Sequence, residues 1–197
     1  MGIVGLDEVG RGCWAGPLVA AAVVLDAGKP IIVGLNDSKQ LSKARRELLN
    51  GTIRAEALSI GVGWVWPEYI DAHGLTAAVK SAMEQAMTQI QAKYSEIIID
   101  GNYNFLPEYA KYAPVRTVIG GDGIIPAISA ASIVAKVARD TYMSDVAAGL
   151  YPKYGFDKHV GYGTALHVEM LKLYGVTELH RRSYKPIQRI EREYRKI

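Results

Sequence analysis

The sequence predicts an α/β fold in which a mixed central β-sheet is flanked by helices. Apolar runs of strand length come first in the chain, and further on such runs alternate with longer helical patterns. A length of 197 residues allows one large domain with a substantial core. We therefore expect one domain over residues 1–197, with the core over about residues 1–145 and a loop and C-terminal helical region over about residues 146–197.

Three apolar runs near the N-terminus predict strands. Ile3–Asp7 is the first of them, and Leu18–Leu25 is continuously apolar, as expected for a buried strand. Ile31–Gly34 predicts a third, short strand. Ser42 is then expected to be the N-cap of a helix that begins at Lys43, because its hydroxyl can accept a backbone N–H from the first turn.

The middle of the chain alternates strand and helix patterns. Ile60–Trp66 alternates large apolar with small residues and ends before Pro67, which predicts a strand. Thr76–Tyr94 places Ala, Val and Met on one face of a long helix. Glu96–Asp100 and Val115–Ile119 predict two short strands.

Helices and loops are predicted for the C-terminal part. A helix begins at Pro126, which suits a first turn, and runs to about Ala148. Leu150–Gly161 is dense in Gly, Pro and aromatic residues and predicts a loop. Thr164–Tyr174 predicts an amphipathic helix that ends at Gly175.

Composition excludes several classes of protein. No apolar run reaches the ~18 residues of a transmembrane helix, and Asp7 and Glu8 interrupt any apolar segment of a signal peptide. The single cysteine, Cys13, excludes an intrachain disulfide and a cysteine-based zinc cluster. Together these observations predict a cytoplasmic protein in a reducing compartment, with no membrane association.

Charge is unevenly distributed along the chain. Residues 180–197 contain seven Lys/Arg and two Asp/Glu, a net charge of +5, which leaves −2 for the rest of a chain whose net charge is +3. A basic tail on a mildly acidic body is compatible with binding to a polyanion. A solvated amphipathic helix explains the same tail equally well.

Acidic residues end several predicted strands. Asp7 and Glu8 follow the first strand, Asp100 ends a later one, and Asp122 lies between two glycines after another. Ligands gather outside the carboxyl ends of strands in open α/β sheets, so we expect these acids to converge on two divalent cations about 3.5–4 Å apart. Asp7 and Glu8 share such a site only if the strand ends or bulges there, because neighbouring strand residues point to opposite faces. Asp100 and Asp122, each beside a glycine, are also compatible with ordinary turns.

Gly10-Arg11-Gly12 follows the first pair of acids. A glycine turn allows backbone N–H groups to approach a phosphate or a sugar closely, and an arginine can bind the same oxygens. This short segment therefore combines metal ligands with groups suited to nucleic acid.

Seven segments occur in a specific order along the chain. They are GLDEVGRG at 5–12, AGPLVAAAVVL at 15–25, LNDSKQLS at 35–42, IIIDGN at 97–102, GGDGIIPAISAASIVAKVARD at 120–140, HVGYGTALH at 159–167 and HRRSY at 180–184. This ordered set resembles the ribonuclease HII family. The resemblance implies a ribonuclease H-like fold and an endonuclease that hydrolyses the RNA strand of RNA–DNA hybrids. It also implies incision 5′ of single ribonucleotides embedded in duplex DNA, 5′-phosphate and 3′-hydroxyl products, two Mg²⁺ or Mn²⁺ ions per site, and a role in ribonucleotide removal during DNA replication and repair.

The resemblance assigns roles to particular residues. The implied catalytic residues and metal ligands are Asp7, Glu8, Asp100 and Asp122. Gly10, Arg11 and Gly12 resemble the motif that senses the 2′-hydroxyl, the group that distinguishes RNA from DNA. Tyr162 matches a tyrosine expected to pack on the deoxyribose just 3′ of the ribonucleotide, and a loop aromatic that covers the core is the alternative.

Further residues resemble family positions at the nucleic-acid backbone, namely Ser38, Lys39, Ser132 and Lys136. Lys39 offers charge to a phosphate and Ser38 a hydroxyl, although both residues are equally compatible with a simple turn. Ser132 and Lys136 lie one helical turn apart and are also compatible with a capped pair on a mostly buried helix. Additional candidates for the same contact are His180, Arg181 and Arg182.

Other features bear on partners and alternatives. His159 and His167 bracket the tyrosine loop and are expected to support it, not to bind metal. Gln188 is followed at the third position by Glu191, where a sliding-clamp peptide needs an aliphatic residue, so clamp binding through that motif is not expected. A monomer suffices for the function. A resolvase or integrase core would also use clustered acids, whereas a non-catalytic hybrid-binding module would not need all four.

Overall fold

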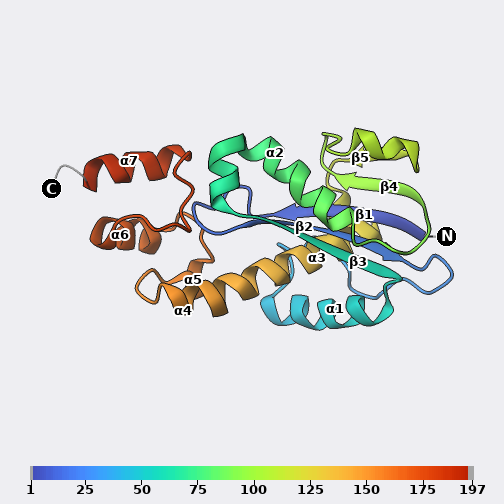
Figure 1. Ribbon diagram of the computed structural model, residues 1–197. Coiled ribbons are helices and arrows are strands. Elements are labelled where there is room, and N and C mark those ends of the chain that lie inside the picture. Colours follow the sequence, from blue (N-terminus) through green and yellow to red (C-terminus); the bar gives the residue numbers. More distant parts are fainter. Residues whose placement is uncertain (1, 195–197) are drawn as a thin grey trace. The chain divides into compact units, whose positions relative to one another are not determined.

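The computed structural model describes residues 2–194, which form two compact units that alternate along the chain (Figure 1). We call residues 2–9, 19–64 and 79–137 the sheet unit, and residues 10–18, 65–78 and 138–194 the helical unit. The last boundary falls between Val137 and Ala138, whereas the sequence predicts a division near residue 145. Residues 1 and 195–197, which the expected domain includes, lie outside the described residues.

A five-stranded mixed sheet dominates the sheet unit, as the sequence predicts, in the order β3-β2-β1-β4-β5. The strands are β1 (Gly2–Val9), β2 (Leu18–Leu25), β3 (Ser59–Val65), β4 (Tyr94–Asp100) and β5 (Val115–Val118). β1 pairs antiparallel with β2 and parallel with β4, and β4 pairs parallel with β5. The carboxyl ends of β1, β4 and β5 therefore lie at the same edge of the sheet.

Helices account for most of the remaining regular structure (Figure 1). The α-helices are α1 (Lys43–Glu56), α2 (Pro67–Met87), α3 (Pro126–Thr141), α4 (Ala148–Leu150), α5 (Phe156–His159), α6 (Ala165–Tyr174) and α7 (Lys185–Tyr194). Two 3₁₀ turns, η1 (Pro107–Lys111) and η2 (Gly121–Gly123), and a π-helical turn, η3 (Tyr142–Ala147), complete the set. As predicted, Ser42 caps α1, because its side chain accepts the backbone N–H of Arg45.

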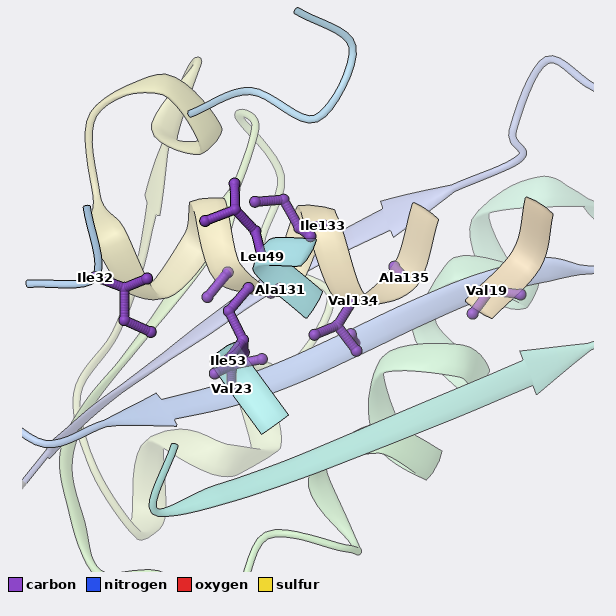
Figure 2. Close-up of a cluster of buried hydrophobic side chains, with 11 residues drawn as sticks. Val19, Val23, Ile32, Leu49, Ile53, Ala131, Ile133, Val134 and Ala135 are labelled. Carbon is purple, nitrogen blue, oxygen red and sulfur yellow. The ribbon is translucent and has the colours of Figure 1, made fainter. Parts of the chain in front are cut away.

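One face of the sheet packs against α1 and α3 (Figure 2). Val19 and Val23 of β2 meet Val134 of α3, and Leu49 and Ile53 of α1 complete this core. All five side chains are buried, which is consistent with the continuously apolar sequence of β2. This core fixes α3 against the sheet, and α3 in turn supplies side chains to the site described below.

The opposite face of β3 lies against α2. A Cβ atom at Gly61 or Gly63 would lie 1.9 Å from the carbonyl oxygen of Ala86 or Ala82, so glycine is required for this close approach. Gln85 and Gln89 then reach the edge of the sheet. Gln85 accepts the Trp64 N–H, and Gln89 both accepts the Val62 N–H and donates to the Val62 carbonyl.

One predicted element of the sheet unit was wrong, and one predicted helix ends earlier than expected. Ile31–Gly34 is not a strand, because Ile31 and Val33 are exposed and Gly34 turns the chain with φ 91°. The helix predicted over Thr76–Tyr94 is present but ends at Met87; it forms the later part of α2, whose backbone is non-helical at Gly74 (φ 82°, ψ 167°). Tyr94 belongs to β4.

The C-terminal helices differ less from expectation. The helix from Pro126 continues beyond Thr141 through η3 and α4, and the loop predicted over Leu150–Gly161 contains the short helix α5. α6 begins after its N-cap Thr164 and ends at Gly175, as predicted. No helix within residues 2–194 is long and apolar enough to cross a membrane.

The helical unit has a core that combines apolar side chains with buried histidines. Met143, Phe156, Leu171 and Ile187 form its apolar part. His159, His167 and His180 are also buried, and the rings of His159 and His167 stack with their centroids 4.3 Å apart. The apolar surroundings disfavour a charge on any of the three rings.

Hydrogen bonds assign the tautomers of two of these histidines. His167 Nδ1 lies 2.9 Å from the Tyr162 carbonyl oxygen, so it carries the proton and donates. Its Nε2 is then the acceptor in the 3.0 Å contact with His180 Nε2. His180 Nδ1, left unprotonated, accepts the Thr177 N–H at 2.9 Å. Both rings are therefore neutral, since a second proton on either would place two donors face to face.

We expect the two buried histidines to lower the free energy of unfolding as the pH is lowered from about 6.5 to about 4. Burial lowers the pKa of His167 to about 4 and that of His180 to about 3, from an ordinary value of 6.5. The unfolded chain therefore binds more protons than the folded chain in this range, and stability rises with pH. The loss near pH 4.5 should be about 2 kcal/mol per histidine. Urea unfolding followed by circular dichroism at several pH values measures it.

The His180→Gln variant provides the control for this titration. It removes one of the two groups, so its unfolding free energy should depend less steeply on pH between about 6.5 and 4 than that of the unsubstituted chain. An equal slope in the two proteins would show that carboxylates elsewhere dominate the acid response.

Candidate functional site

Three aspartates converge at the carboxyl edge of the sheet. The parallel register of β1 and β4 brings Asp7 alongside Asp100. Asp122 approaches from η2, and this turn is held in place because the Gly121 N–H donates to the Asp100 carboxylate at 2.8 Å. One carboxylate oxygen of each aspartate lies within 4.8 Å of the others. The convergence predicted from the strand ends is therefore present for these three residues.

Glu8 lies outside this group of three. Asp7 pairs with Ala21 of β2, which belongs to the core beneath α3, whereas Glu8 pairs with Ala20. The pairing continues without a bulge to Val9, so the side chains of Asp7 and Glu8 leave opposite faces of β1. The negative charge of Glu8 nevertheless raises the pKa of Asp7. The role of Glu8 as a metal ligand stays a prediction.

Burial and mutual repulsion dominate the electrostatics of the three aspartates. Burial raises the pKa of Asp7 to about 8, and the charges of Glu8 and Asp100 add to this effect. The pKa of Asp122 is also raised, by burial first and then by Asp100 and Asp37. A bound cation would reverse this penalty. Three converging carboxylates form an oxygen-only donor set, which fits a hard divalent cation such as Mg²⁺ or Mn²⁺.

Two serines lie behind Asp7. The hydroxyl groups of Ser38 and Ser132 are 2.9 Å apart, and both residues are buried. Ser132, from α3, hydrogen-bonds the Asp7 carboxylate. In this structure Ser132, itself in contact with Ser38, supports the Asp7 carboxylate. The predicted contact of the two serines with a nucleic-acid backbone stays a prediction.

Lys39 provides a positive charge beside Asp122. Its Nζ lies 3.6 Å from Asp122 and 3.8 Å from Asp37, while most of its side chain is exposed. These acids raise the pKa of Lys39, although burial opposes them. The sequence predicts only a turn at Asp37, and its spacing carries no sign that this carboxylate approaches Asp122. Lys136 lies one turn after Ser132 on α3 and is partly exposed.

The Gly10-Arg11-Gly12 segment forms an exposed turn of the helical unit. The Cys13 N–H donates to the Gly10 carbonyl at 3.3 Å, and Gly10 has φ 93°. Only glycine adopts this conformation without strain. Arg11 and Gly12 are exposed, and a Cβ atom at Gly12 would meet nothing within 4 Å. Open space therefore lies on the Cβ side of Gly12.

Backbone hydrogen bonds join the Tyr162 loop to the segment that follows this turn. The Gly161 carbonyl accepts the N–H groups of Trp14 and Ala15, at 2.9 and 3.3 Å. Trp14 packs directly against Gly163, where a Cβ atom would lie 2.2 Å from the indole. The Tyr162 side chain is 40% exposed, and burial of its inner part raises its pKa to about 12. Part of Tyr162 therefore remains accessible.

Histidines support the Tyr162 loop, as predicted. His167 donates to the Tyr162 carbonyl, and His159 accepts the Gly161 N–H while its other ring nitrogen donates to the Tyr154 carbonyl at 2.8 Å. Neither ring belongs to the metal-ligand group found among the described residues.

Two candidates for nucleic-acid contact are contradicted by their burial. His180 and Arg181 are 1% and 0% exposed, because their side chains satisfy other groups inside the helical unit. Arg182 is exposed, and its backbone N–H donates to Asp71. The sequence gives no sign of this burial. Charged residues are rarely fully buried, so HRRSY predicts a surface segment.

Removal of the Asp7 charge should stabilise the metal-free protein and abolish the effect of metal. The Asp7→Asn variant relieves repulsion in a buried acidic cluster, so at pH 8.5 in EDTA its unfolding free energy should exceed that of the unsubstituted chain by on the order of 1–2 kcal/mol. Mn²⁺ should raise the melting temperature of the unsubstituted chain but not that of the variant.

Thermal unfolding followed by circular dichroism, with EDTA or Mn²⁺, measures both effects. Glu47→Gln, which removes an exposed charge from α1 of the same unit, is the matched control and should keep the response to Mn²⁺. A normal Mn²⁺ shift in the Asp7→Asn variant would contradict the assignment of a metal site to these aspartates.

Comparison with known proteins gives consistent matches over nearly the whole chain. The family model described as Ribonuclease HII matches residues 4–187. A protein described as Ribonuclease HII from Dichelobacter nodosus is 49% identical over 187 residues, which cover 94% of this chain and 95% of the relative. A Ribonuclease HII from Shewanella piezotolerans is 47% identical over 184 residues, covering 93% and 88% of the two chains.

Solved structures match the fold. The crystal structure of ribonuclease H2 from Pyrococcus horikoshii aligns over 100% of both chains with a TM-score of 0.84 and 29% identity. The ribonuclease HII in a complex with PCNA from Archaeoglobus fulgidus aligns with a TM-score of 0.79 and 27% identity, over 94% of this chain and 96% of that one. Bst-RNase HIII in complex with Mn²⁺ has the same fold at 17% identity, with a TM-score of 0.76 over 100% of this chain and 71% of that one.

Proposed function

The chain belongs to the ribonuclease HII family, and we propose that it hydrolyses the RNA strand of RNA–DNA hybrids and incises 5′ of single ribonucleotides embedded in duplex DNA. The observation that carries the proposal is the convergence of Asp7, Asp100 and Asp122 within 4.8 Å. Removal of such ribonucleotides serves DNA replication and repair. A single copy of the chain is sufficient for this role.

Members of this metal-dependent hydrolase family need no nucleophile from the protein. In our proposal Asp7, Asp100 and Asp122, with Glu8, hold two Mg²⁺ or Mn²⁺ ions. Such cations would supply Lewis-acid charge at the scissile phosphate. Hydrolysis by water breaks the bond between phosphorus and the 3′-oxygen and leaves 5′-phosphate and 3′-hydroxyl ends. Ser132 orients the Asp7 carboxylate for this task.

Substrate recognition in this proposal uses charged, backbone and aromatic groups. Lys39 and Lys136 supply positive charge to the nucleic-acid backbone, alongside Ser38 and Ser132. The Gly10-Arg11-Gly12 turn senses the 2′-hydroxyl, and the exposure of Arg11 and Gly12 supports that role. Tyr162 packs on the deoxyribose that follows the ribonucleotide, and the exposed part of its ring supports this contact.

The Asp100→Asn variant should lose nearly all cleavage while keeping its fold. The amide cannot supply the negative charge that holds the cations, so the rate should fall by roughly 10³-fold or more. Gel assays of a labelled RNA–DNA hybrid with Mg²⁺, Mn²⁺ or EDTA measure the loss, and circular dichroism checks the fold. Glu47→Gln is again the matched control and should cleave normally. Turnover of the Asp100→Asn variant at the unsubstituted rate would remove Asp100 from the site.

A duplex that contains one ribonucleotide tests junction recognition. We expect a metal-dependent nick on its 5′ side, no cleavage of the all-DNA duplex, and no cleavage in EDTA. Tyr162→Ala should lower kcat/KM for this substrate by about tenfold through loss of stacking, with a smaller effect on a long hybrid. Cleavage of the hybrid alone by the unsubstituted chain would keep the nuclease and reject the role of Tyr162.

A further inference from the structure

Arg181 is fully buried beneath the Gly10-Arg11-Gly12 turn. Its Nη1 donates to the carbonyl oxygens of Gly10, at 2.6 Å, and Arg11, at 3.1 Å. Its Nε and Nη2 both donate to the Gly16 carbonyl, at 3.1 and 2.9 Å. One guanidinium thus holds both the turn and the segment that follows it.

Carbonyl oxygens and a phenol take the place of the usual carboxylate partner of Arg181. Within residues 2–194, the groups found to accept from its guanidinium are the carbonyls of Gly10, Arg11 and Gly16 and the hydroxyl of Tyr184. Burial of a cation without an anion is unfavourable, and burial lowers the pKa of Arg181. The planar fork of five donors matches several carbonyls at once, which a lysine ammonium cannot do.

Tyr184 completes the hold on the turn. Its hydroxyl accepts from Arg181 Nη1 at 2.9 Å and donates to the Arg11 carbonyl at 2.6 Å. The Arg11 carbonyl therefore receives two hydrogen bonds from the same side. Among the described residues, the hydrogen bonds found between the Tyr184 side chain and the turn run through this carbonyl and through Arg181.

The hydrogen-bonded carbonyls determine where the amides of the turn point. The described residues contain no cis peptide bond, so each N–H points in the opposite direction from the preceding C=O within the same peptide plane. The carbonyls of Gly10 and Arg11 point at Arg181. The N–H groups of Arg11 and Gly12, which share those peptide planes, therefore point away from it, and both residues are exposed.

We propose that Arg181 and Tyr184 are positioning residues that aim the backbone N–H groups of the Gly10-Arg11-Gly12 turn at the 2′-oxygen of a ribonucleotide. This inference rests on the proposed function of the turn and adds the device that maintains it. Neither residue touches the substrate. The discrimination between ribose and deoxyribose depends on both, whereas the attraction to phosphate depends on the Arg11 side chain.

Binding measurements in the non-cleaving Asp100→Asn protein separate these contributions. Fluorescence anisotropy with Mg²⁺ gives Kd for a labelled duplex with one ribonucleotide and for the same duplex in all-DNA form. The Kd for the all-DNA duplex divided by the Kd for the ribonucleotide duplex reports ribose preference. Arg181→Lys and Tyr184→Phe should reduce this ratio roughly three- to tenfold, because one or two hydrogen bonds that orient the turn are lost.

Two further variants separate the orientation of the turn from its charge and from the packing of the helical unit. Arg11→Ala keeps the backbone amides and loses the side-chain charge, so it should weaken binding to both duplexes by a similar factor and keep the ratio. Leu171→Ala perturbs the apolar core of the same unit and should also keep the ratio.

The amide of Gly12 gives a direct readout of the turn. In ¹⁵N NMR spectra of the Asp100→Asn protein, the parent of these variants, addition of the ribonucleotide duplex should shift the Gly12 amide resonance more than addition of the all-DNA duplex. This difference should be lost in Arg181→Lys, because the lysine no longer fixes the direction of the amide.

The outcomes are distinct. If Arg181→Lys and Tyr184→Phe fold and keep the parent ratio, the inference is wrong while the proposed function stands. If Arg181→Lys does not fold, Tyr184→Phe alone decides, since it removes one hydroxyl from a partly buried ring. If the parent binds both duplexes equally, the turn does not sense ribose, and the proposed function of the turn fails together with the inference.

Discussion

The parallel pairing of β1 and β4 is the constraint on which the aspartate site depends. It aligns two strand ends so that Asp7 and Asp100 become neighbours, and Asp100 then holds the turn that carries Asp122. Each carboxylate is there because the backbone places it, against an electrostatic penalty visible in the raised pKa of Asp7. Apolar packing of α3 on the sheet contributes free energy of folding that offsets this penalty. The same helix supplies the serine that hydrogen-bonds Asp7.

The helical unit contains buried positive charges, whereas the sheet unit contains buried carboxylates. Arg139 and Arg181 are both 0% exposed, and both donate to backbone carbonyls of residues 10–17. Arg139 also donates to the Val160 carbonyl, so it links this segment to the tyrosine loop. A loop whose carbonyls are held from one side keeps a defined shape without regular secondary structure. Neutral histidines extend the same principle to Tyr162.

Much of this arrangement could be predicted from the sequence, and the exceptions have physical reasons. β2 and the caps of α6 follow from local pattern, and the three aspartates follow from their position after apolar strands. The face on which Glu8 lies depends on the absence of a bulge, which no local signal decides. The burial of Arg181 depends on carbonyls 165 or more residues away in the sequence. The local sequence around Arg181 therefore predicts a basic surface.

The glutamines beside β3 bear on how the protein behaves at high concentration. β3 is an edge strand, and an unpaired edge is a template on which another chain can add a strand. Gln85 and Gln89 already occupy the outward N–H groups of Trp64 and Val62 and the Val62 carbonyl. An incoming strand must displace these side chains before it can pair. The edge is thereby protected against aggregation by two amides, without a proline or a charged residue in that part of the strand.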